Sequence, residues 1–211
     1  HIRSATSRRR MKNVEPAKPD DLARLQSELQ PRFALPILIA GWCGLRSGEL
    51  RALRVKDVDV VGGWIRVRQG VTRISGQVLV GPPKTPASVR DVAVPPHLLP
   101  SIKTWIEHLP EGEAERYLFP GREPTAPMSE KALRHAFAKA KELIDRPDMT
   151  FHDLRHTAAT LAAQNGATTA ELMRRLGHTT ASMAMRYQHS SAQRDRQIAE
   201  ALSSLLKSEE K

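Results

Sequence analysis

The chain has 211 residues and is 40% hydrophobic, which is enough for one large or two small globular domains with a sizeable core. Its 33 lysines and arginines exceed its 23 aspartates and glutamates, and the net charge of +10 favours a polyanionic partner such as nucleic acid. The single cysteine, Cys43, excludes an intrachain disulfide and fits a reducing cytoplasm, and the most apolar stretch, 33–45, is shorter than the roughly 18 residues of a membrane span.

The N-terminal residues 1–17 are polar, include three consecutive arginines at 8–10 and have no hydrophobic period. This composition predicts a flexible arm or linker, followed by one domain over 18–211. No apolar segment follows the basic residues, so no signal peptide is predicted. Leucines then recur at helical spacing and predict a first helix over 20–30.

The elements that follow predict an α+β fold that is mainly α-helical. The apolar run after Pro31 predicts a second helix, and SGELRAL (47–53) predicts a short third one. The period then changes to two, which predicts a small antiparallel sheet of three strands, at 64–68, 77–80 and 89–94. Helical spacing resumes in six segments: 97–109, 129–144, 154–164, 169–176, 181–187 and 191–206.

Six residues carry the chemistry that a phosphodiester requires. They lie in the phrases GLRSGEL, PPKTPASVR, HDLRH, LGHTT and MRYQH, and they are Arg46, Lys84, His152, Arg155, His178 and Tyr187. The charge on the non-bridging oxygens becomes more localised as phosphorus becomes pentavalent, and two planar guanidiniums, Arg46 and Arg155, are the candidates to hold it. Glu49, three residues after Arg46 on the predicted short helix, is positioned to orient that guanidinium as a supporting residue.

The candidate nucleophile is one of only two tyrosines. Tyr117 lies in the apolar segment YLFP, which favours a packing role, whereas Tyr187 precedes a polar turn near a predicted helix end. A phenol has a pKa of about 10, so at neutral pH only about one molecule in a thousand is ionised without help. Removal of its proton must therefore be part of catalysis, and His152 and His178 are candidate neutral-pH groups for the site.

These phrases, in this order and from about Glu15 to Leu206, resemble the catalytic domain of the tyrosine recombinases, the phage-integrase family. The resemblance implies the tyrosine-recombinase catalytic fold and an integrase-type site-specific recombinase. In this reaction Tyr187 attacks the phosphorus, forms a 3′-phosphotyrosine link and releases a 5′-hydroxyl, without a metal or any other cofactor. It assigns His152 as general base or proton shuttle, His178 as a hydrogen-bond donor to the scissile phosphate and Lys84 as the general acid for the departing 5′-oxygen.

The same resemblance implies the partners. They are double-stranded DNA at a specific recombination site and, in a synaptic complex, three further copies of the chain, which is expected to be a monomer when free. No membrane is implied, and a cytoplasmic location on the nucleoid of a bacterial host follows. The segment 191–206 is an amphipathic helix that docks either on a neighbouring protomer or on its own domain. Family members usually carry a core-binding domain before the catalytic one, so 1–17 is expected to be the end of a linker.

Three alternatives remain open at this level. HDLRH superficially matches the zinc-protease pattern with two histidines four residues apart, but the permanent charge of Arg155 beside His156 argues against a dication there. A type IB topoisomerase would use a similar cleavage centre to relax supercoils. A helical DNA-binding protein without catalysis would also be basic. Thr85, Ser88 and Arg90 either serve function or shape the chain around Lys84.

Overall fold

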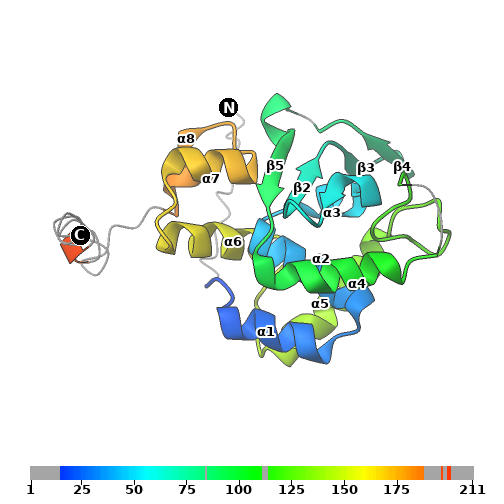
Figure 1. Cartoon of the computed structure of the whole chain (residues 1–211), viewed down its shortest axis with the longest axis horizontal. Coiled ribbons are helices and arrows are strands. Elements are labelled where there is room, and N and C mark those ends of the chain that lie inside the picture. The colour runs from blue at the N-terminus through cyan, green and yellow to red at the C-terminus, as the bar shows by residue number, and fades with distance from the viewer. Residues whose placement is uncertain (1–14, 84, 111–113, 188–195, 197–198, 201–211) are drawn as a thin grey trace, which may run out of the picture.

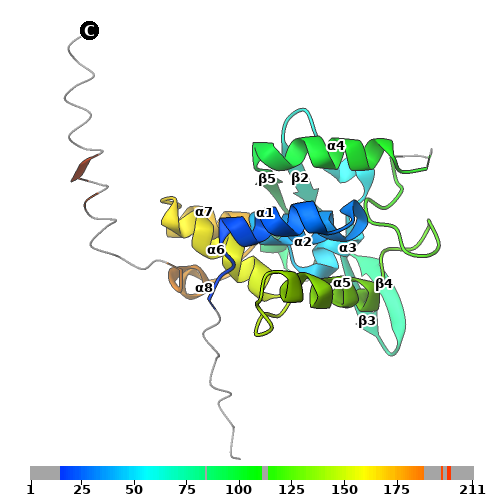
Figure 2. The ribbon, with the colours of Figure 1, turned by 90° about the horizontal axis from the view of Figure 1, so that it is seen from below.

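The apolar run after Pro31 forms α2 (Pro31–Cys43), the helix around which the other helices pack. The computed structural model describes residues 15–83, 85–110, 114–187, 196, 199 and 200. Helix α2 contacts α1, α3, α4, α5 and α6, and Figure 2 shows α1 and α2 between α4 and α5. Ile37, Leu38 and Ile39 are fully buried, because a helix that is apolar on every side belongs in the centre of a core.

The remaining helices confirm the predicted ones, with ends that agree to within about two residues. They are α1 (Pro19–Glu28), α3 (Ser47–Ala52), α4 (Leu99–Glu107), α5 (Glu130–Leu143), α6 (Asp153–Gln164), α7 (Thr169–Leu176) and α8 (Ala181–Met185). In Figure 1, α6, α7 and α8 lie together on one side of the sheet. The helix predicted at 191–206 falls almost entirely outside the described residues.

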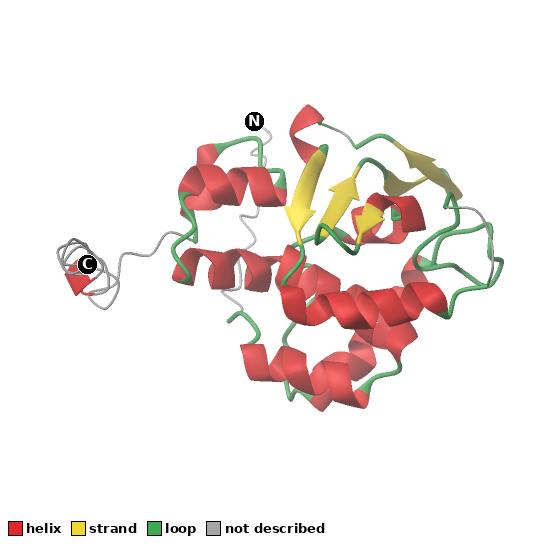
Figure 3. Ribbon diagram, in the orientation of Figure 1, coloured by secondary structure: helices red, strands yellow, loops and turns green. Residues whose placement is uncertain are grey.

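The sheet differs from the prediction of one three-stranded sheet with 77–80 as a member. The three-stranded sheet has the antiparallel order β1-β2-β5, and β3 and β4 form a separate two-stranded hairpin (Figure 3). The strands are β1 (Val58–Asp59), β2 (Trp64–Val67), β3 (Gly70–Ile74), β4 (Gln77–Gly81) and β5 (Arg90–Ala93). Segment 77–80 is a strand, as predicted. It does not pair with β2, because β1 and β5 occupy both edges of β2, and it pairs with β3 instead.

A two-residue turn explains this pairing. Ser75 and Gly76 both have positive φ, 48° and 84°, and they connect Ile74 to its partner Gln77. Positive φ at both central residues matches the twist of a tight hairpin, so the chain closes locally on itself. The hairpin contacts α3, with Val71 as its buried residue, and β4 leads toward the segment that contains Lys84.

The residues just before α1 pack on the domain. Ala17 is buried and donates its backbone N–H to the Thr157 hydroxyl at 3.0 Å. Arg146 donates to the Glu15 carbonyl at 2.6 Å and to the Pro16 carbonyl at 3.4 Å. Residues 15–17, at the end of the predicted linker, therefore contact the domain.

Gly44 ends α2 and brings the end of that helix against α7. Its φ of 73° is left-handed, and a Cβ added there would lie 2.5 Å from Leu176 Cδ2 and 3.3 Å from Ala158 Cβ. The position therefore requires glycine twice, for its backbone conformation and for its lack of a side chain. Residues on both sides of this contact belong to the candidate site.

Replacing Gly44 with alanine is expected to lower the free energy of unfolding by about 1–2 kcal/mol for the left-handed backbone and by a further ~1–3 kcal/mol for the overlap with Leu176. Gly63 is the matched control, because its φ is 72° and its added Cβ would come no closer than 3.6 Å to Leu99 Cδ1. Urea unfolding of Gly44→Ala and Gly63→Ala separates the two contributions. Equal losses in the two variants would contradict the proposed overlap.

Candidate active site

The ends of several helices bring the predicted residues together. Arg46 caps α3, Arg155 and His156 lie in the first turn of α6, His178 follows α7 and Tyr187 follows α8. Lys84 lies outside the described residues. Its neighbours Pro83 and Thr85 line a pocket of about 450 Å³ together with Arg46, Ser88 and Gly177. Five of the six predicted residues are therefore described and converge on one region.

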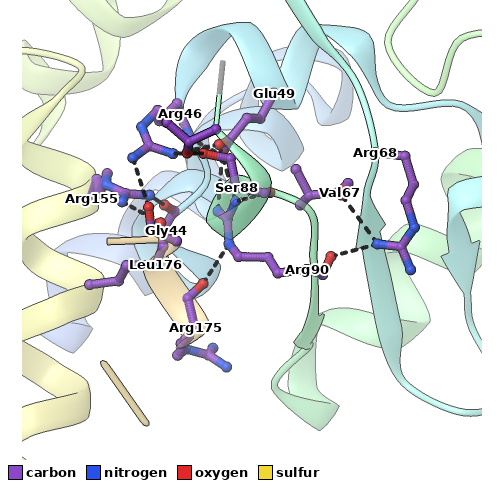
Figure 4. A network of polar contacts seen from close by, with 12 residues as sticks. Gly44, Arg46, Glu49, Val67, Arg68, Ser88, Arg90, Arg155, Arg175 and Leu176 are labelled. Atoms are coloured by element: carbon purple, nitrogen blue, oxygen red, sulfur yellow. Dashed lines mark hydrogen bonds and ion pairs between the residues drawn. The ribbon is translucent and has the colours of Figure 1, made fainter. Parts of the chain in front are cut away.

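Arg155 is held by backbone carbonyls at the ends of two helices. Its side chain is buried, and its guanidinium donates to the Gly44 carbonyl at 2.6 Å and to the Leu176 carbonyl (Figure 4). The exposed carbonyls at helix C-termini carry partial negative charge, which suits a buried cation. Burial, and then the charge of Arg46, lower the pKa of Arg155 to about 9, which leaves it protonated at neutral pH.

Arg46 is fixed from behind by Glu49, in the arrangement anticipated from their spacing. Its guanidinium donates to Glu49 Oε1 at 2.7 Å and to the Gly177 carbonyl at 3.2 Å, while its backbone N–H donates to Glu49 Oε2 at 2.9 Å. The Arg46 side chain is 36% exposed, in contrast to the buried Arg155. Some N–H groups of the Arg46 guanidinium therefore remain available to donate to a ligand.

Arg90 is the buried counterpart of Arg46 on the other side of Glu49. It donates to Glu49 Oε1 at 3.1 Å and to Oε2 at 2.9 Å, and its remaining bonds go to the Ser88 and Arg175 carbonyls (Figure 4). Burial by itself would raise the pKa of Glu49, but the hydrogen bond and charge of Arg90, together with Arg46, outweigh it and hold that pKa below its usual range. Arg90 therefore supports Glu49, and through it Arg46.

His178 is a buried neutral imidazole among cations. Burial comes first, followed by the charges of Arg155, Arg46 and Arg90, and these lower its pKa to about 4. In the described structure, its buried Nδ1 has no hydrogen-bond partner. A buried ring nitrogen without a partner is costly, and a phosphate oxygen would both satisfy it and favour its protonated form.

The depressed pKa of His178 makes stability dependent on pH. Because its folded pKa of about 4 lies below the ordinary 6.5, His178 contributes stability above pH 6.5 that is lost as the pH falls toward 4. The variant His178→Gln is expected to show a shallower decline over that window. His152 and His156 also have lowered pKa values, so part of the decline remains in the variant. Denaturant unfolding between pH 7 and pH 4 measures the difference, and parallel curves would refute it.

Tyr187 turns its ring into the same region. The hydroxyl of Tyr187 is hydrogen-bonded to Nδ1 of His156, and the two ring centroids lie 5.8 Å apart. The His178 ring is stacked with that of Tyr187 at a centroid distance of 6.4 Å. Burial raises the pKa of the Tyr187 phenol, and the positive charge of Arg155 partly counters this. The candidate nucleophile is thus already inside the cationic cluster.

His152 lines a pocket together with the clamp, the pair of guanidiniums of Arg46 and Arg155. It lines a cavity of about 550 Å³ together with Arg46 and Arg155, and apolar walls come from Phe137 and Phe151. Its ring meets that of His156 edge-on, with centroids 5.0 Å apart. Burial, and then the charges of His156 and Arg155, lower the pKa of His152. His152 therefore lies beside the two guanidiniums.

Positive charge is in excess around the candidate site. Among the described residues, Arg46 and Arg90 pair with one buried carboxylate, Glu49, whose charge also acts on the nearby Arg155. An oxyanion placed beside Arg46 and His178 would supply the missing negative charge and a missing acceptor. A phosphate group of a nucleic acid has this chemistry, and the phenol of Tyr187 lies close enough to His178 to share the same site.

A family model decides the assignment, because residues 18–194 match that of the phage integrase family. The chain belongs to the phage integrase family. It is 43% identical over 211 residues to the putative prophage phiRv2 integrase of Mycobacterium tuberculosis strain H37Rv, covering 99% of this chain and 56% of that protein. It is 40% identical over 203 residues to the integrase of Mycobacterium phage L5, covering 93% and 54%. The chain spans about half the length of these curated relatives.

Solved structures show the same fold. The Tn1549 transposon integrase, in complex with transposon right end DNA, superimposes with a TM-score of 0.75 at 21% identity, covering 92% of this chain and 67% of that one. The XerA recombinase has a TM-score of 0.62 at 21% identity, covering 87% and 63%. The predicted tyrosine-recombinase catalytic fold is therefore confirmed.

Two residues of this integrase-family site were not placed in it by the sequence. The sequence leaves Arg90 open between function and structure, and its contacts with Glu49 favour the structural role. His156 enters the sequence analysis only as a neighbour of Arg155, although its position four residues after His152 puts both rings on one helix face. That spacing indicates the contact between the two histidines, but the contact of His156 with Tyr187 joins residues that are distant in sequence.

No group of three or more histidine, cysteine and carboxylate side chains in the described part of the chain is arranged to hold a metal ion. None of the helices described is both long and apolar enough to cross a membrane.

Proposed function

We propose that this chain is the catalytic domain of an integrase-type site-specific DNA recombinase, which cleaves and rejoins strands through a 3′-phosphotyrosine intermediate. The observation that carries the proposal is the hydroxyl of Tyr187 lying within a site that also contains Arg155, Arg46 and the unpartnered Nδ1 of His178. Family membership and the 43% identity to a prophage integrase support it. The proposed domain covers 18–211, preceded by a linker.

The roles follow from the positions of the residues. Arg46 and Arg155 hold the non-bridging oxygens of the scissile phosphate, and His178 donates a hydrogen bond to one of them. Tyr187 is the nucleophile, and His152, beside the clamp, is the general base or proton shuttle. Lys84 is proposed as the general acid on the strength of its motif, and the adjacent pocket contains Arg46. Because the phosphotyrosine conserves the energy of the broken bond, neither ATP nor a metal is required.

The proposed partners are double-stranded DNA and further copies of the chain. The net charge of +10 and the solved complex of the Tn1549 integrase with transposon right end DNA support DNA as the substrate. Exchange between two duplexes needs four cleavages, so we propose a homotetramer in the synaptic complex and a monomer in its absence. We propose that recombination takes place on the nucleoid, in the cytoplasm of a bacterial host.

Trapping the covalent intermediate tests the proposal. Nicked duplexes tiled across the DNA that flanks the coding sequence are incubated with the chain, and products are separated in SDS. The wild type and Tyr117→Phe are expected to form an SDS-resistant adduct on one duplex, in the presence of a chelator, and Tyr187→Phe is expected to form none. Tyr117 is the matched control because it is the only other tyrosine. No wild-type adduct on any duplex would overturn the enzyme assignment.

Topoisomerase activity is the second candidate, because the same cleavage centre can religate its own strand. Mixing two distinguishable duplexes that carry the site separates the two functions. Joined products that combine both duplexes support the recombinase. Relaxation of a supercoiled plasmid without such products would support the topoisomerase instead.

A further inference from the structure

A second basic pocket lies next to the clamp, between α3, the β3–β4 hairpin and the start of α5 (Figure 2). Its volume is about 500 Å³, and it shares Ser47 and Glu130 with the pocket that contains Arg46 and Arg155. The two pockets are therefore adjacent. The polar side chains that line the second pocket include Ser47, Arg51, Arg73, Ser129, Glu130 and Lys131.

Arg51 is a buried cation that lines this second pocket. It is only 7% exposed, and its Nε donates to the Met128 carbonyl at 2.6 Å. Within the described part of the chain, its two terminal nitrogens donate no hydrogen bond and form no ion pair. Ser47 and Arg51 are four residues apart on α3, so both side chains lie on the helix face that borders the pocket. A ligand with acceptor oxygens would satisfy these buried donors.

Positive charge is in excess in the second pocket. Arg73 and Lys131 are exposed at its rim. Of the described residues that line it, Glu130 is the one carboxylate, and Glu130 pairs with Arg134. Burial lowers the pKa of Arg51, and the charge of Glu130 opposes this as the smaller effect. An anion in the pocket would therefore meet three cations and one carboxylate that is already paired.

The first turn of α5 adds backbone donors to the pocket. Helix α5 has 14 residues, and the hydroxyl of its N-cap, Ser129, accepts from the Ala132 N–H at 3.1 Å. The N–H groups of Glu130 and Lys131 come before that bond and have no partner within the helix. A helix N-terminus favours anions, and phosphate oxygens in particular accept from its free N–H groups. The buried guanidinium and the helix start thus fit the same ligand, a phosphate group.

We propose that the second pocket binds another backbone phosphate of the recombination-site DNA, besides the scissile one, and that Arg51 is its central ligand. The proposal rests on the recombinase function above, which places a DNA strand across the clamp. Arg46 and Arg51 are five residues apart, or about 7.5 Å along the axis of α3. Phosphates recur about every 3.4 Å of axis along one DNA strand. A strand held at Arg46 therefore brings a neighbouring phosphate to Arg51, and the second contact fixes the position of the strand in the clamp.

Neutralising one phosphate at a time tests this proposal. A series of duplexes carries a single methylphosphonate at successive positions around the cleavage point, and equilibrium binding is measured with Tyr187→Phe, which cannot cleave. One position besides the scissile phosphate is expected to weaken binding by about 10-fold, the scale of a charge-assisted hydrogen bond. Adding Arg51→Gln is expected to weaken binding to the unmodified duplex by a similar factor. The methylphosphonate at that second position then has no further effect, because both changes remove the same contact.

Two lysine variants complete the test. Lys131→Gln removes a charge at the rim of the pocket and stays informative if thermal unfolding shows that Arg51→Gln is unstable. It is expected to reduce the slope of log affinity against log salt by about one, and to weaken the response to the same methylphosphonate. Lys103→Gln is the matched control, because Lys103 is an exposed helix lysine on α4 that does not line the pocket. It is expected to keep the full response to that methylphosphonate.

Three outcomes would overturn the proposal. The first is that Arg51→Gln and Lys131→Gln respond to every methylphosphonate as their parent does. The second is that calorimetry finds inorganic phosphate bound in an Arg51-dependent way while no methylphosphonate position is coupled to Arg51, which would mean a site for a free anion. Both leave the recombinase function intact, because that function is judged by the covalent adduct of the wild type. The third, no binding to any duplex, would overturn the recombinase function as well.

Discussion

Replacing Arg155 with lysine is expected to slow strand cleavage by about 10²- to 10³-fold while the protein stays folded. The Arg155 guanidinium is buried, and it already uses two donors on the Gly44 and Leu176 carbonyls. A fork can hold these carbonyls and still direct a donor toward a phosphate, which a single ammonium cannot do. The burial and the neighbouring Arg46, which lower the pKa of Arg155 to about 9, would also favour the neutral form of a lysine there.

Arg175 provides the matched control for this prediction. Its guanidinium also bridges two backbone carbonyls, those of Ala93 and Trp42, each at 3.1 Å. Because Arg175 has no place in the proposed reaction, Arg175→Lys is expected to lose stability without a comparable loss of cleavage rate. Single-turnover cleavage and thermal unfolding are measured for both variants. Wild-type cleavage by Arg155→Lys would remove Arg155 from the clamp.

The helices could be predicted from the sequence because their signals are local. Leucines at helical spacing and glycines at the helix ends are contained in single segments, and the structure keeps the limits that they predict. The serine cap predicted for the third helix is wrong, because the N-cap is Arg46 and Ser47 is the first helical residue. The pairing of strands is not local. The sequence did not separate the β3–β4 hairpin from the sheet, although Ser75 and Gly76 between two β-branched runs are a turn signal.

The site shows the same division between local and distant information. The spacing of three residues predicts that Glu49 lies beside Arg46, and the hydrogen bonds between them confirm it. The contact of His156 with Tyr187 spans 31 residues, and the bonds of Arg90 to Glu49 span 41. Sequence spacing does not predict contacts over such distances, so the supporting residues could not be predicted. The residues with a direct chemical role could be recognised from their motifs. The catalytic roles themselves stay predictions until the variants are measured.

The second large effect is expected at Glu49, and it falls on stability. Glu49 is the carboxylate between Arg46 and the buried Arg90. Replacing it with glutamine leaves a buried guanidinium without its counter-charge, which is expected to lower the free energy of unfolding by about 3–5 kcal/mol. Since the folded pKa of Glu49 is depressed, its contribution is present above the unfolded pKa and is lost as the pH falls through the folded value.

Glu115 is the control for Glu49 because it also pairs with two cations, Arg54 and Lys56, but at the surface. Solvent screens that pair, so Glu115→Gln is expected to change stability little. Urea unfolding at pH 7 measures both variants, and repetition at acidic pH is expected to bring the wild type and Glu49→Gln together. A Glu49→Gln protein as stable as Glu115→Gln would mean that the carbonyls of Ser88 and Arg175 alone satisfy Arg90. Arg46 would then owe its position to Gly177 rather than to a buried charge.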